Sequence, residues 1–427
     1  MQILLSRSIT KAASVAAVIA LIICSDLAFT SGMANKSAIV RPELGKEQLK
    51  KVDARLIAGS SKFAFKLYEQ AVKQRGGKNL LISPTSVVLA LAMTYNGAEK
   101  ETQRAMANTL GLESMSLEEV NRAAADLISA LGSTDPKVQL KIANSLWSKN
   151  GFVLKPAFVQ RSKEYYGAEV ASLDFANPEA PETINSWVER NTEGRIKGIV
   201  DQIDPDVILF LINAIYFKGE WQVQFQKEKT KDDLFRLAGG RQKTLPMMFQ
   251  SGKYLYQKGK DFQAVILPYG TGKVSMYIFL PDEKTPLDQF ERNVTQENWE
   301  TWLRGFRLAP GDLTLPRFKM EYAVLMNDML KAMGMAVAFD PARADFSGIA
   351  DLGGGRIYIS KVKHKAVAEV NEEGTVAAAV TSVEFGVTSA QLPQENFVMK
   401  VDRPFFFAIG DNATGNLLFM GSVADPA

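Results

Sequence analysis

His364 is the only histidine of the chain, so it limits the catalytic chemistry that the sequence could support. A serine hydrolase uses a histidine as the base that takes the proton from its nucleophilic serine. The Gly-x-Ser-x-Gly turn that carries this serine in many hydrolases does not occur in the sequence. His364 itself stands in residues 361–367, whose alternating pattern indicates a strand. We expect a hydrogen-bonded core histidine, and we predict no catalytic residue.

The sequence also lacks a complete motif for a metal site, for cysteine chemistry or for a phosphate-binding loop. A single histidine excludes a histidine-rich zinc site, and the only cysteine, Cys24, lies in an apolar run near the N-terminus. Gly270-Thr-Gly-Lys273 resembles part of a phosphate-binding loop. The upstream glycine is missing, however, and Val274 replaces the Ser or Thr that would bind magnesium. We therefore expect a hairpin turn there and a plain loop at residues 353–355, and we predict no metal and no cofactor.

The first 34 residues have the pattern of an export signal. Arg7 and Lys11 accompany an apolar run at residues 12–24, which is too short for a comfortable transmembrane helix. Ala28 and Ala34 are candidate cleavage positions. We expect residues 1–34 to be a signal peptide and residues 35–427 to form a single domain. The mature protein would be secreted (extracellular, or periplasmic in a bacterium) and would not contact a membrane.

Two other interpretations of this N-terminus stay open. The apolar run could be retained as a membrane anchor. Leu21-Ile22-Ile23-Cys24 also loosely resembles a bacterial lipoprotein signal. Because Ile23 is bulky where a small residue is expected before the modified cysteine, we rank lipidation of Cys24 below simple cleavage.

Composition and periodicity indicate a globular α+β protein. The chain is 46% hydrophobic and 23% charged, with a net charge of +3 that gives no support to a nucleic acid partner. Helical spacing dominates the first third and strand patterns dominate the remainder. We predict helices at residues 47–74, 84–95, 99–110, 116–131 and 326–335. We predict strands from residue 138 and at 207–217, 264–267, 274–280 and 356–370, with a C-terminal hairpin of 405–409 and 417–423.

A long connection after the predicted strand 356–370 has an unusual composition. From Gly374 to Gln391 it contains small, β-branched and a few apolar residues, without Lys, Arg, Pro or Asn. With a period of two, the face of Thr375, Ala377, Ala379, Thr381, Val383 and Phe385 carries no charge. Such a segment could become a central strand, since a proline would remove a ladder hydrogen bond and an inward charge would need desolvation. A flexible loop that never inserts is the alternative.

Ordered motifs along the chain resemble the serpin family of serine protease inhibitors. They include Glu372-Glu-Gly-Thr375 with Ala377-Ala-Ala379, Asn79-Leu-Leu-Ile-Ser-Pro-Thr-Ser86 and Asn213-Ala-Ile-Tyr-Phe-Lys-Gly-Glu-Trp221. Leu315-Pro-Arg-Phe318, His364-Lys-Ala366 and Val401-Asp-Arg-Pro-Phe405 also match. The resemblance implies an α+β serpin fold, in which several helices surround three β-sheets and an exposed reactive-centre loop. It implies a suicide substrate whose cleaved loop inserts into the main sheet while a serine protease is held as an acyl-enzyme.

The same resemblance implies roles for individual residues. The hinge of the loop would be Glu372, Glu373, Gly374, Thr375, Ala377, Ala378 and Ala379. Ser83, Ser86, Asn213 and His364 would form the polar cluster called the shutter. Trp221 and Arg317 would belong to the breach, where Arg317 pairs with Glu372. The hinge departs from the usual family pattern at Val376 and Val380, both on the outward face, and neither adds a charge or a proline to the inserting face.

Counting from the hinge places the scissile bond at Thr388-Ser389, with Phe385-Gly386 as the alternative. The loop has no Lys or Arg before Lys400, which excludes a trypsin-like target. We predict an elastase- or subtilisin-like target, then a chymotrypsin-like one. Residues 116–131, where some family members bind heparin, carry Glu118, Glu119, Asp126 and only Arg122, so we expect no heparin binding. We expect a monomer.

Two alternatives to inhibition stay open. The first is a non-inhibitory serpin that acts as a carrier, chaperone or storage protein. Its hinge would usually carry bulky or charged inward residues, which this hinge does not have. The second is an unrelated secreted hydrolase, which would need a base other than His364.

Overall fold

The computed structural model describes residues 52–426 except 133–134, 205, 352–355 and 376–395, and these described residues belong to one compact unit. Within them, no helix combines the length and the apolar character needed to cross a membrane. The same residues contain no group of three or more His, Cys, Asp or Glu side chains placed to hold a metal ion.

Local signals in the sequence explain where the N-terminal helices begin and end. Ser83 caps the helix that starts at Pro84, and its side chain accepts a hydrogen bond from Ser86 N. Ser116 and Glu119 form a capping box, since Ser116 N donates to Glu119 and Glu119 N donates to Ser116 Oγ at 3.3 Å. Gly111 ends a helix with φ 70°. The helices are α2 (Ala54–Gln74), α3 (Pro84–Tyr95), α4 (Lys100–Leu110), α5 (Leu117–Gly132), α6 (Pro156–Tyr166) and α7 (Ala180–Asn191).

The main sheet has six described strands in the order β11-β13-β5-β2-β4, with β14 paired to β5. Strand β5 alternates between two cores, because Leu211 and Ile215 face one apolar cluster while Phe210 and Ile212 face the other. The strand predicted at 207–217 is therefore buried on both faces. The strands are β11 (Phe318–Leu325), β13 (Lys361–Val370), β5 (Leu209–Glu220), β2 (Val138–Lys149), β4 (Glu169–Leu173) and β14 (Gly374–Thr375).

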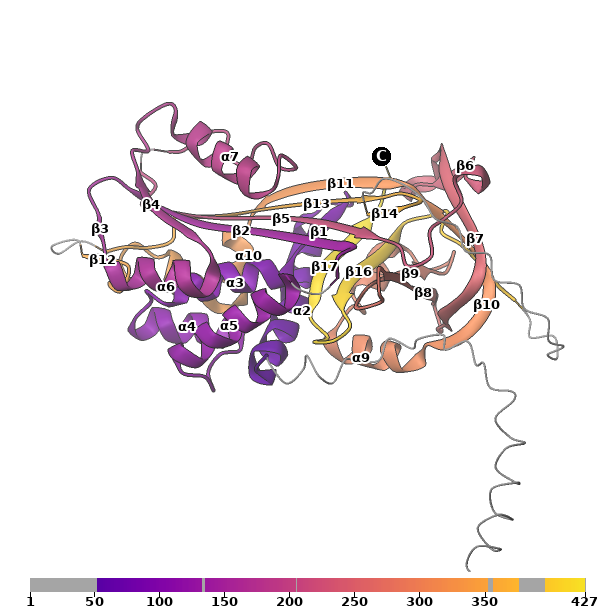
Figure 1. Ribbon diagram of the computed structural model, residues 1–427, viewed down its shortest axis with the longest axis horizontal. Coiled ribbons are helices and arrows are strands. Elements are labelled where there is room, and N and C mark those ends of the chain that lie inside the picture. The colour runs from indigo at the N-terminus through magenta and orange to yellow at the C-terminus, as the bar shows by residue number, and fades with distance from the viewer. Residues whose placement is uncertain (1–51, 133–134, 205, 352–355, 376–395, 427) are drawn as a thin grey trace, which may run out of the picture. The chain divides into compact units, whose positions relative to one another are not determined.

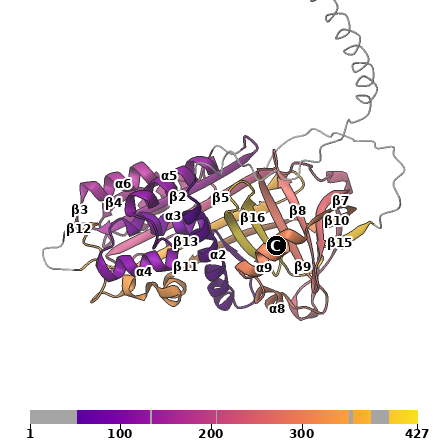
Figure 2. The ribbon, with the colours of Figure 1, turned by 90° about the horizontal axis from the view of Figure 1, so that it is seen from below.

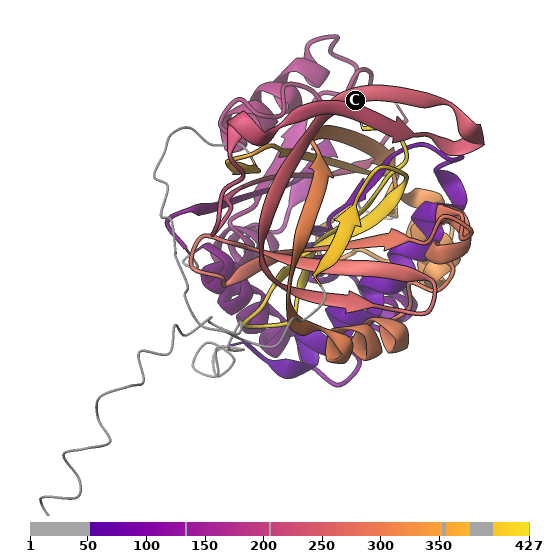
Figure 3. The ribbon, with the colours of Figure 1, turned by 90° about the vertical axis from the view of Figure 1, so that its right-hand side faces the viewer.

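A nine-stranded sheet contains most of the other strands. The long strand β7 (Gln242–Lys258) pairs with β6 (Lys231–Arg236), β8 (Phe262–Tyr269) and β10 (Arg307–Pro316) at different points along its length. The remaining members are β9 (Val274–Pro281), β15 (Phe397–Lys400), β1 (Leu80–Ile82) and the predicted C-terminal hairpin of β16 (Phe405–Asp411) and β17 (Leu417–Val423). Figure 3 shows the yellow C-terminal strands lying among strands from the middle of the chain. A two-stranded ladder of β3 (Val153–Leu154) and β12 (Ala350–Asp351) completes the three sheets of the described residues.

Three predicted elements differ from the structure. The helix expected at 47–74 is described from Ala54, with Asp53 as its N-cap in an extended conformation. The helix expected at 326–335 is only α10 (Asn327–Leu330), followed by a π-turn (Lys331–Met335) in which Gly334 takes φ 115° and breaks the helical path. The strand expected from residue 356 begins only at Lys361. The turn expected at Gly270–Lys273 does join β8 to β9, with Gly270 and Gly272 at positive φ. Two further short helices are α8 (Leu287–Glu291) and α9 (Gln296–Gly305).

Helices cover both faces of the main sheet. Figure 1 shows α7 above its strands and α3, α5 and α6 below them. Figure 2, from below, shows the helices α3 to α6 on one side of α2 and the strands β7 to β9 on the other. A cluster around Trp187, Val188 and Ile199 packs the region of α7 onto one face of β5, while the larger core fills the other side. The main sheet is therefore a buried middle layer, and a change in its strand order must disturb both cores.

Candidate functional site

The chain turns sharply where β13 ends and β14 begins. Asn371 N donates to Gly374 O at 2.8 Å, and Asn371 Oδ1 accepts from Gly374 N at 3.2 Å. Gly374 has φ 143°, and a Cβ atom added there would stand 2.0 Å from the Gly219 carbonyl oxygen. Only glycine permits both this backbone conformation and this close approach. The predicted hinge residue Gly374 is thus required by the local geometry.

Strands β13 and β5 separate at the end of the sheet that is nearest this turn. They pair in parallel from Lys361 and Phe210 to Val367 and Tyr216, and the described residues form no β13–β5 pair beyond that point. Strand β14 continues the ladder instead, since Gly374 pairs antiparallel with Glu220 and Thr375 with Gly219. Thr375 is completely buried. Both residues of β14 therefore lie in the gap between the two separating strands.

Tyr269, at the end of β8, holds Thr375 from the interior. The two hydroxyl groups lie 3.0 Å apart, and neither side chain is exposed. The Tyr269 ring stacks on Trp221 with centroids 4.4 Å apart and planes at 11°. Gly219 permits this arrangement, because a Cβ atom there would lie 2.8 Å from the Tyr269 ring. Burial raises the pKa of Tyr269, so the hydroxyl stays neutral and able to donate.

Trp221 binds the backbone of the predicted hinge. Its indole Nε1 donates to Asn371 O at 2.9 Å, and its backbone N donates to Glu373 O at 2.8 Å. Since the side chain is only 2% exposed, these bonds are shielded from water. The structure thus places the predicted breach residue Trp221 in direct contact with the hinge.

Arg317 and Glu372 form the ion pair that the family resemblance implied. Arg317 Nε lies 2.8 Å from both carboxylate oxygens of Glu372, whose side chain is 3% exposed. Thr230 Oγ1 donates to the same carboxylate. Burial alone would raise the pKa of Glu372, but the hydrogen bonds from Arg317 and Thr230 outweigh it and lower the pKa. The neighbouring Glu373 pairs with Lys227 at 2.5 Å, so both acidic hinge residues are bound to the body of the protein.

The four predicted shutter residues lie together at the middle of the β13–β5 pair, where His364 and Asn213 of the two strands meet Ser83 and Ser86 at the start of α3. His364 Nδ1 and Asn213 Oδ1 lie 2.6 Å apart, and Ser86 Oγ donates to the same Asn213 oxygen at 2.9 Å. Ser83 N donates to His364 Nε2 at 3.2 Å. Asn213 Nδ2 donates to Asn144 Oδ1 at 2.6 Å, which adds a residue of β2 to the cluster. Because His364 and Asn213 stand on the two different strands, their hydrogen bond joins β13 to β5.

The contacts of His364 define its protonation state. Nε2 accepts from a backbone N–H, so in the neutral ring the proton sits on Nδ1, which donates to Asn213. Complete burial lowers the pKa of His364 to about 3. A neutral histidine with both nitrogens occupied and no access to solvent is a structural residue, as the sequence predicted.

Three lysines on the solvent side of β13 bind the segment that connects α7 to β5. Lys363 Nζ donates to Ile199 O at 3.0 Å, and Lys365 Nζ donates to Gly198 O at 2.6 Å. Lys361 pairs with Asp204 at 2.5 Å. The side chains of Ile199 and Val200 pack in the same cluster as Phe210 and Ile212 of β5. This connecting segment is therefore attached to β13 by hydrogen bonds and to β5 by apolar packing.

Sequence reasoning missed several of these residues. The sequence patterns do not indicate a role for Tyr269, Asn144, Lys227 or Thr230. An aromatic residue directly before a Gly-x-Gly turn was the available signal for Tyr269, but its partner Thr375 is 106 positions away. The predicted positions Ala377, Ala378, Ala379, Phe385, Gly386, Thr388 and Ser389 lie outside the described residues.

Comparison with known proteins agrees with this arrangement. Residues 58–426 match the family model "Serpin (serine protease inhibitor)". Human leukocyte elastase inhibitor is 35% identical over 385 residues, which cover 87% of this chain and 99% of that protein. Human neuroserpin is 34% identical, over 82% of this chain and 86% of its own length. The native crystal structure of the thermophilic serpin tengpin, 34% identical, has a TM-score of 0.80 over 88% of this chain and 95% of its own. This chain therefore belongs to the serpin family of serine protease inhibitors, and it is an inhibitor rather than an enzyme.

Proposed function

We propose that this serpin traps an elastase- or subtilisin-like serine protease by inserting its cleaved loop between β13 and β5. The observation that carries the proposal is the pairing of Gly374 and Thr375 with β5 at the point where β13 and β5 part. An additional strand entering this gap would run antiparallel to both neighbours, because β13 and β5 are parallel to each other. The hinge thus supplies the first two residues of the strand that insertion would complete.

Cleavage of the loop at the scissile bond would free the segment after the hinge to insert. The protease serine oxygen would bond to the carbonyl carbon of Thr388 while the peptide C–N bond to Ser389 breaks. Ser389 N would take up a proton and leave as a new amino terminus. The protease then stays attached by an ester to the segment that begins at the hinge, and insertion carries it along the sheet. Trapping requires that insertion distort the protease before water hydrolyses this ester.

The register of the described strands favours one alignment of the inserted segment. The Thr375–Gly219 pair, continued one residue at a time, brings Thr381 opposite Asn213 of β5. The Asn371–Gly374 bridge, continued in the same way, brings Thr381 opposite His364 of β13. Asn213 and His364 are themselves paired in the present sheet, so the two registers agree. In this alignment Thr381 would stand between the two residues whose hydrogen bond insertion has to break.

The composition of the loop supports burial on one face. Residues that share a face with Thr375 and Thr381 in the extended segment are Ala377, Ala379, Val383 and Phe385, none of which is charged. Their burial releases apolar surface from water, and new backbone hydrogen bonds form on both edges of the strand. The native state is then metastable: the loop-inserted state has the lower free energy, and kinetic barriers retain the native state.

The residues before the bond determine the class of target. Thr388 at the bond, with Val387 before it, fits a small apolar specificity pocket, and the alternative Phe385 fits a chymotrypsin-like one. We propose that the signal at residues 1–34 is removed, that the domain of residues 35–427 acts outside the cytoplasm, and that it acts as a monomer. Independence from heparin is supported on α5, where the predicted lone basic residue Arg122 is paired with Glu118 at 3.0 Å.

Incubation of the purified protein with pancreatic elastase, subtilisin, chymotrypsin and trypsin tests the proposal. We expect an SDS-resistant complex with elastase or subtilisin, a clip at Thr388-Ser389, and no complex with trypsin. A complex with chymotrypsin alone and a clip after Phe385 would move the bond to the alternative position. Clean cleavage by every protease, without a complex and without a gain in thermal stability, would support the non-inhibitory alternative instead.

A further inference from the structure

Asp135 stands just before β2, and its carboxylate binds the turn that joins β8 to β9. Oδ2 accepts hydrogen bonds from the backbone N of Thr271 and, at 2.6 Å, from Thr271 Oγ1. Oδ1 accepts from Lys137 N at 2.9 Å. Asp135 is 7% exposed, so these bonds are largely shielded from water. One carboxylate thus joins the chain entering the main sheet to a turn of the nine-stranded sheet.

The turn is shaped to receive an ionised carboxylate. Gly270 has φ 48°, and a Cβ atom added there would stand 2.4 Å from Asp135 Oδ2. A side chain at this position would therefore exclude the carboxylate. Burial alone would raise the pKa of Asp135, but the hydrogen bonds from Thr271 and Lys137 outweigh it and lower the pKa. Both oxygens accordingly act as acceptors.

The position of this turn determines the position of Tyr269. Tyr269 is the last residue of β8, two residues before Thr271. Its hydroxyl lies 3.0 Å from the hydroxyl of Thr375 in β14. A hydrogen bond of this kind depends on placement within a few tenths of an ångström. Any movement of the turn away from Asp135 would therefore be transmitted to the contact between Tyr269 and Thr375.

The turn is also attached at other points. Asn412, in the connection between β16 and β17, donates from its backbone N to Lys273 O and from Nδ2 to Gly272 O, both at 2.8 Å. Gly270 N donates to Glu220 O of β5 at 2.8 Å. The turn is thus held between the two large sheets, beside the end of β5 where the hinge pairs.

We propose that Asp135 is a positioning residue for loop insertion, because it holds the Tyr269 hydroxyl against Thr375 through the turn at 270–273. In this arrangement Thr375 stays in register with β5, and the inserting strand can grow from it. A hinge that leaves the sheet has to return before the strand can grow, and this delay favours hydrolysis of the acyl-enzyme. The consequence for trapping rests on the proposed inhibitory function, whereas the effect on the hinge does not.

Hydrogen-exchange mass spectrometry of the intact protein tests the effect on the hinge without a protease. In Asp135→Ala we expect the backbone N–H groups of Gly374 and Thr375 to exchange about tenfold faster. The double variant Asp135→Ala/Tyr269→Phe should exchange no faster than Tyr269→Phe alone, because both substitutions act on one contact. Effects that multiply in the double variant would overturn the proposal, since Asp135 would then act by another route.

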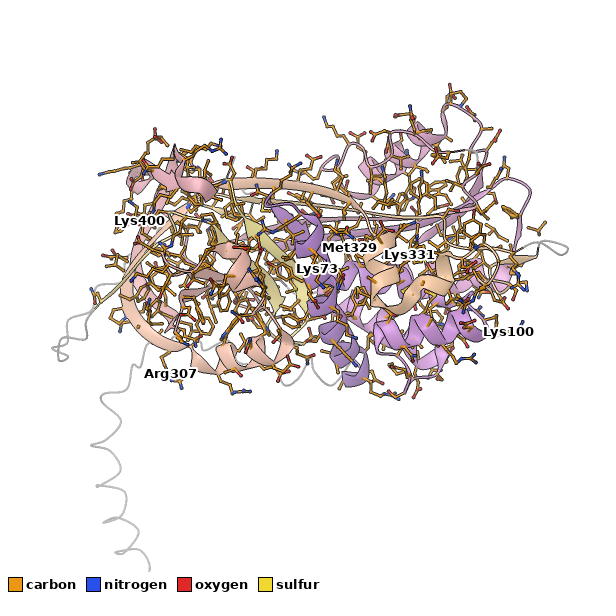
Figure 4. The ribbon with its side chains drawn as sticks, turned by 180° about the vertical axis from the view of Figure 1, so that it is seen from behind. Lys73, Lys100, Arg307, Met329, Lys331 and Lys400 are labelled. Atoms are coloured by element: carbon orange, nitrogen blue, oxygen red, sulfur yellow. The ribbon has the colours of Figure 1, made fainter. Side chains whose placement is uncertain are left out.

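Asp345→Ala is the matched control. Asp345 also accepts a hydrogen bond from a backbone N–H, that of Ser347 at 3.2 Å, and it pairs with Lys100 at 3.0 Å. Figure 4 shows Lys100 at the opposite end of the molecule from Lys400. We expect parental exchange at the hinge in this variant. Equal acceleration in Asp345→Ala and Asp135→Ala would indicate a general loss of stability and overturn the proposal.

Substitutions on the other side of the contact keep the test independent of the Asp135 variant. Thr271→Val removes the hydroxyl that Asp135 accepts from and keeps the backbone N–H, so hinge exchange should rise about threefold. Thr271→Ser keeps both donors and should stay close to the parent. Equal exchange in the valine and serine variants would count against the proposal.

The stoichiometry of elastase inhibition then tests the consequence for trapping. We expect more inhibitor molecules to be consumed per protease in Asp135→Ala and Thr271→Val, and a parental value in Thr271→Ser. Parental hinge exchange and stoichiometry in Asp135→Ala, while the parent protein traps elastase, would overturn the role of Asp135 alone. If the parent protein formed no complex with any protease, the inhibitory function would fail, and the exchange measurements would still decide whether Asp135 positions the hinge.

Discussion

The hydroxyl groups of Tyr269 and Thr375 lie 3.0 Å apart in the protein interior, where they join the nine-stranded sheet to the start of the loop. Their hydrogen bond is shielded by the Trp221 ring stacked on Tyr269. A buried hydroxyl that loses its partner destabilises its surroundings by about 1–3 kcal/mol. The two partners therefore set how readily Thr375 leaves the sheet.

Tyr269→Phe removes this hydrogen bond and keeps the ring stack. We expect the backbone N–H groups of Gly374, Thr375 and Gly219 to exchange with solvent about tenfold faster, since the opening free energy falls by roughly 1–2 kcal/mol. Hydrogen-exchange mass spectrometry of peptides that cover the hinge and the end of β5 measures this change. Tyr256→Phe, which removes the hydroxyl that donates to Gln263 at 2.9 Å, is the control. Equal protection in the two variants would mean that Tyr269 does not anchor the hinge.

Thr375→Arg should convert the inhibitor into a substrate. Thr375 is completely buried between β13 and β5, and an unpaired guanidinium there would lose several kcal/mol of hydration. Loop insertion then becomes slower than hydrolysis of the acyl-enzyme. We therefore expect the number of inhibitor molecules consumed per protease to rise more than about tenfold. Titration of protease activity against inhibitor concentration measures this stoichiometry. Thr375→Ser keeps the hydroxyl and should stay close to the parent, whereas an unchanged value for the Arg variant would argue against insertion.

The sequence predicted the local elements well, and it predicted contacts between distant elements only through family resemblance. The helices predicted at 84–95, 99–110 and 116–131 all form, and short-range contacts bound them: the caps at Ser83 and Ser116 and the end at Gly111. The helix predicted at 326–335 was wrong in its second half, where Gly334 takes a left-handed conformation that periodicity does not reveal. The sequence did not predict the role of Tyr269, because its partner Thr375 belongs to the other large sheet. Contacts of that kind depend on the packing of distant strands, which no local pattern encodes.

Thr381→Val should weaken the cleaved, inserted form and leave the intact protein unchanged. In the proposed register Thr381 lies between Asn213 and His364, which exchange a hydrogen bond of 2.6 Å while the sheet is closed. Valine would leave both groups without that partner, so the cleaved form should lose about 1–3 kcal/mol of stability. Guanidinium unfolding of the intact and cleaved proteins measures the two values separately. Thr388→Val, close to the scissile bond, is the matched control, and equal losses in the two cleaved variants would contradict the register.

Lys363→Ala/Lys365→Ala should accelerate insertion. The two lysines bind Ile199 O and Gly198 O from β13, while the segment that carries these carbonyls packs on β5. A strand that enters between β13 and β5 moves them about 4.8 Å further apart. Either the lysine hydrogen bonds to β13 or the apolar packing on β5 must then break. We expect faster trapping and faster spontaneous conversion to a loop-inserted state on warming. Lys319→Ala, on β11, is the control, and slower trapping in the double variant would show that these bonds assist insertion.

His364 should make the native state sensitive to mild acid. Its pKa is lowered to about 3 by burial, whereas the exposed histidine of the unfolded chain titrates at 6.5. Between these two values the unfolded state binds more protons than the native state, so the free energy of unfolding decreases as pH falls, by up to roughly 1.4 kcal/mol per pH unit. Protonation of the native ring would also turn Nε2 into a donor that faces the Ser83 N–H, which explains why the folded protein resists it. Urea unfolding of the parent and of His364→Gln between pH 5 and pH 7, above the range in which ordinary carboxylates titrate, isolates this contribution. The substitution itself will lower stability at every pH, so the slope with pH is the test, and parallel pH profiles for the two proteins would refute the assignment.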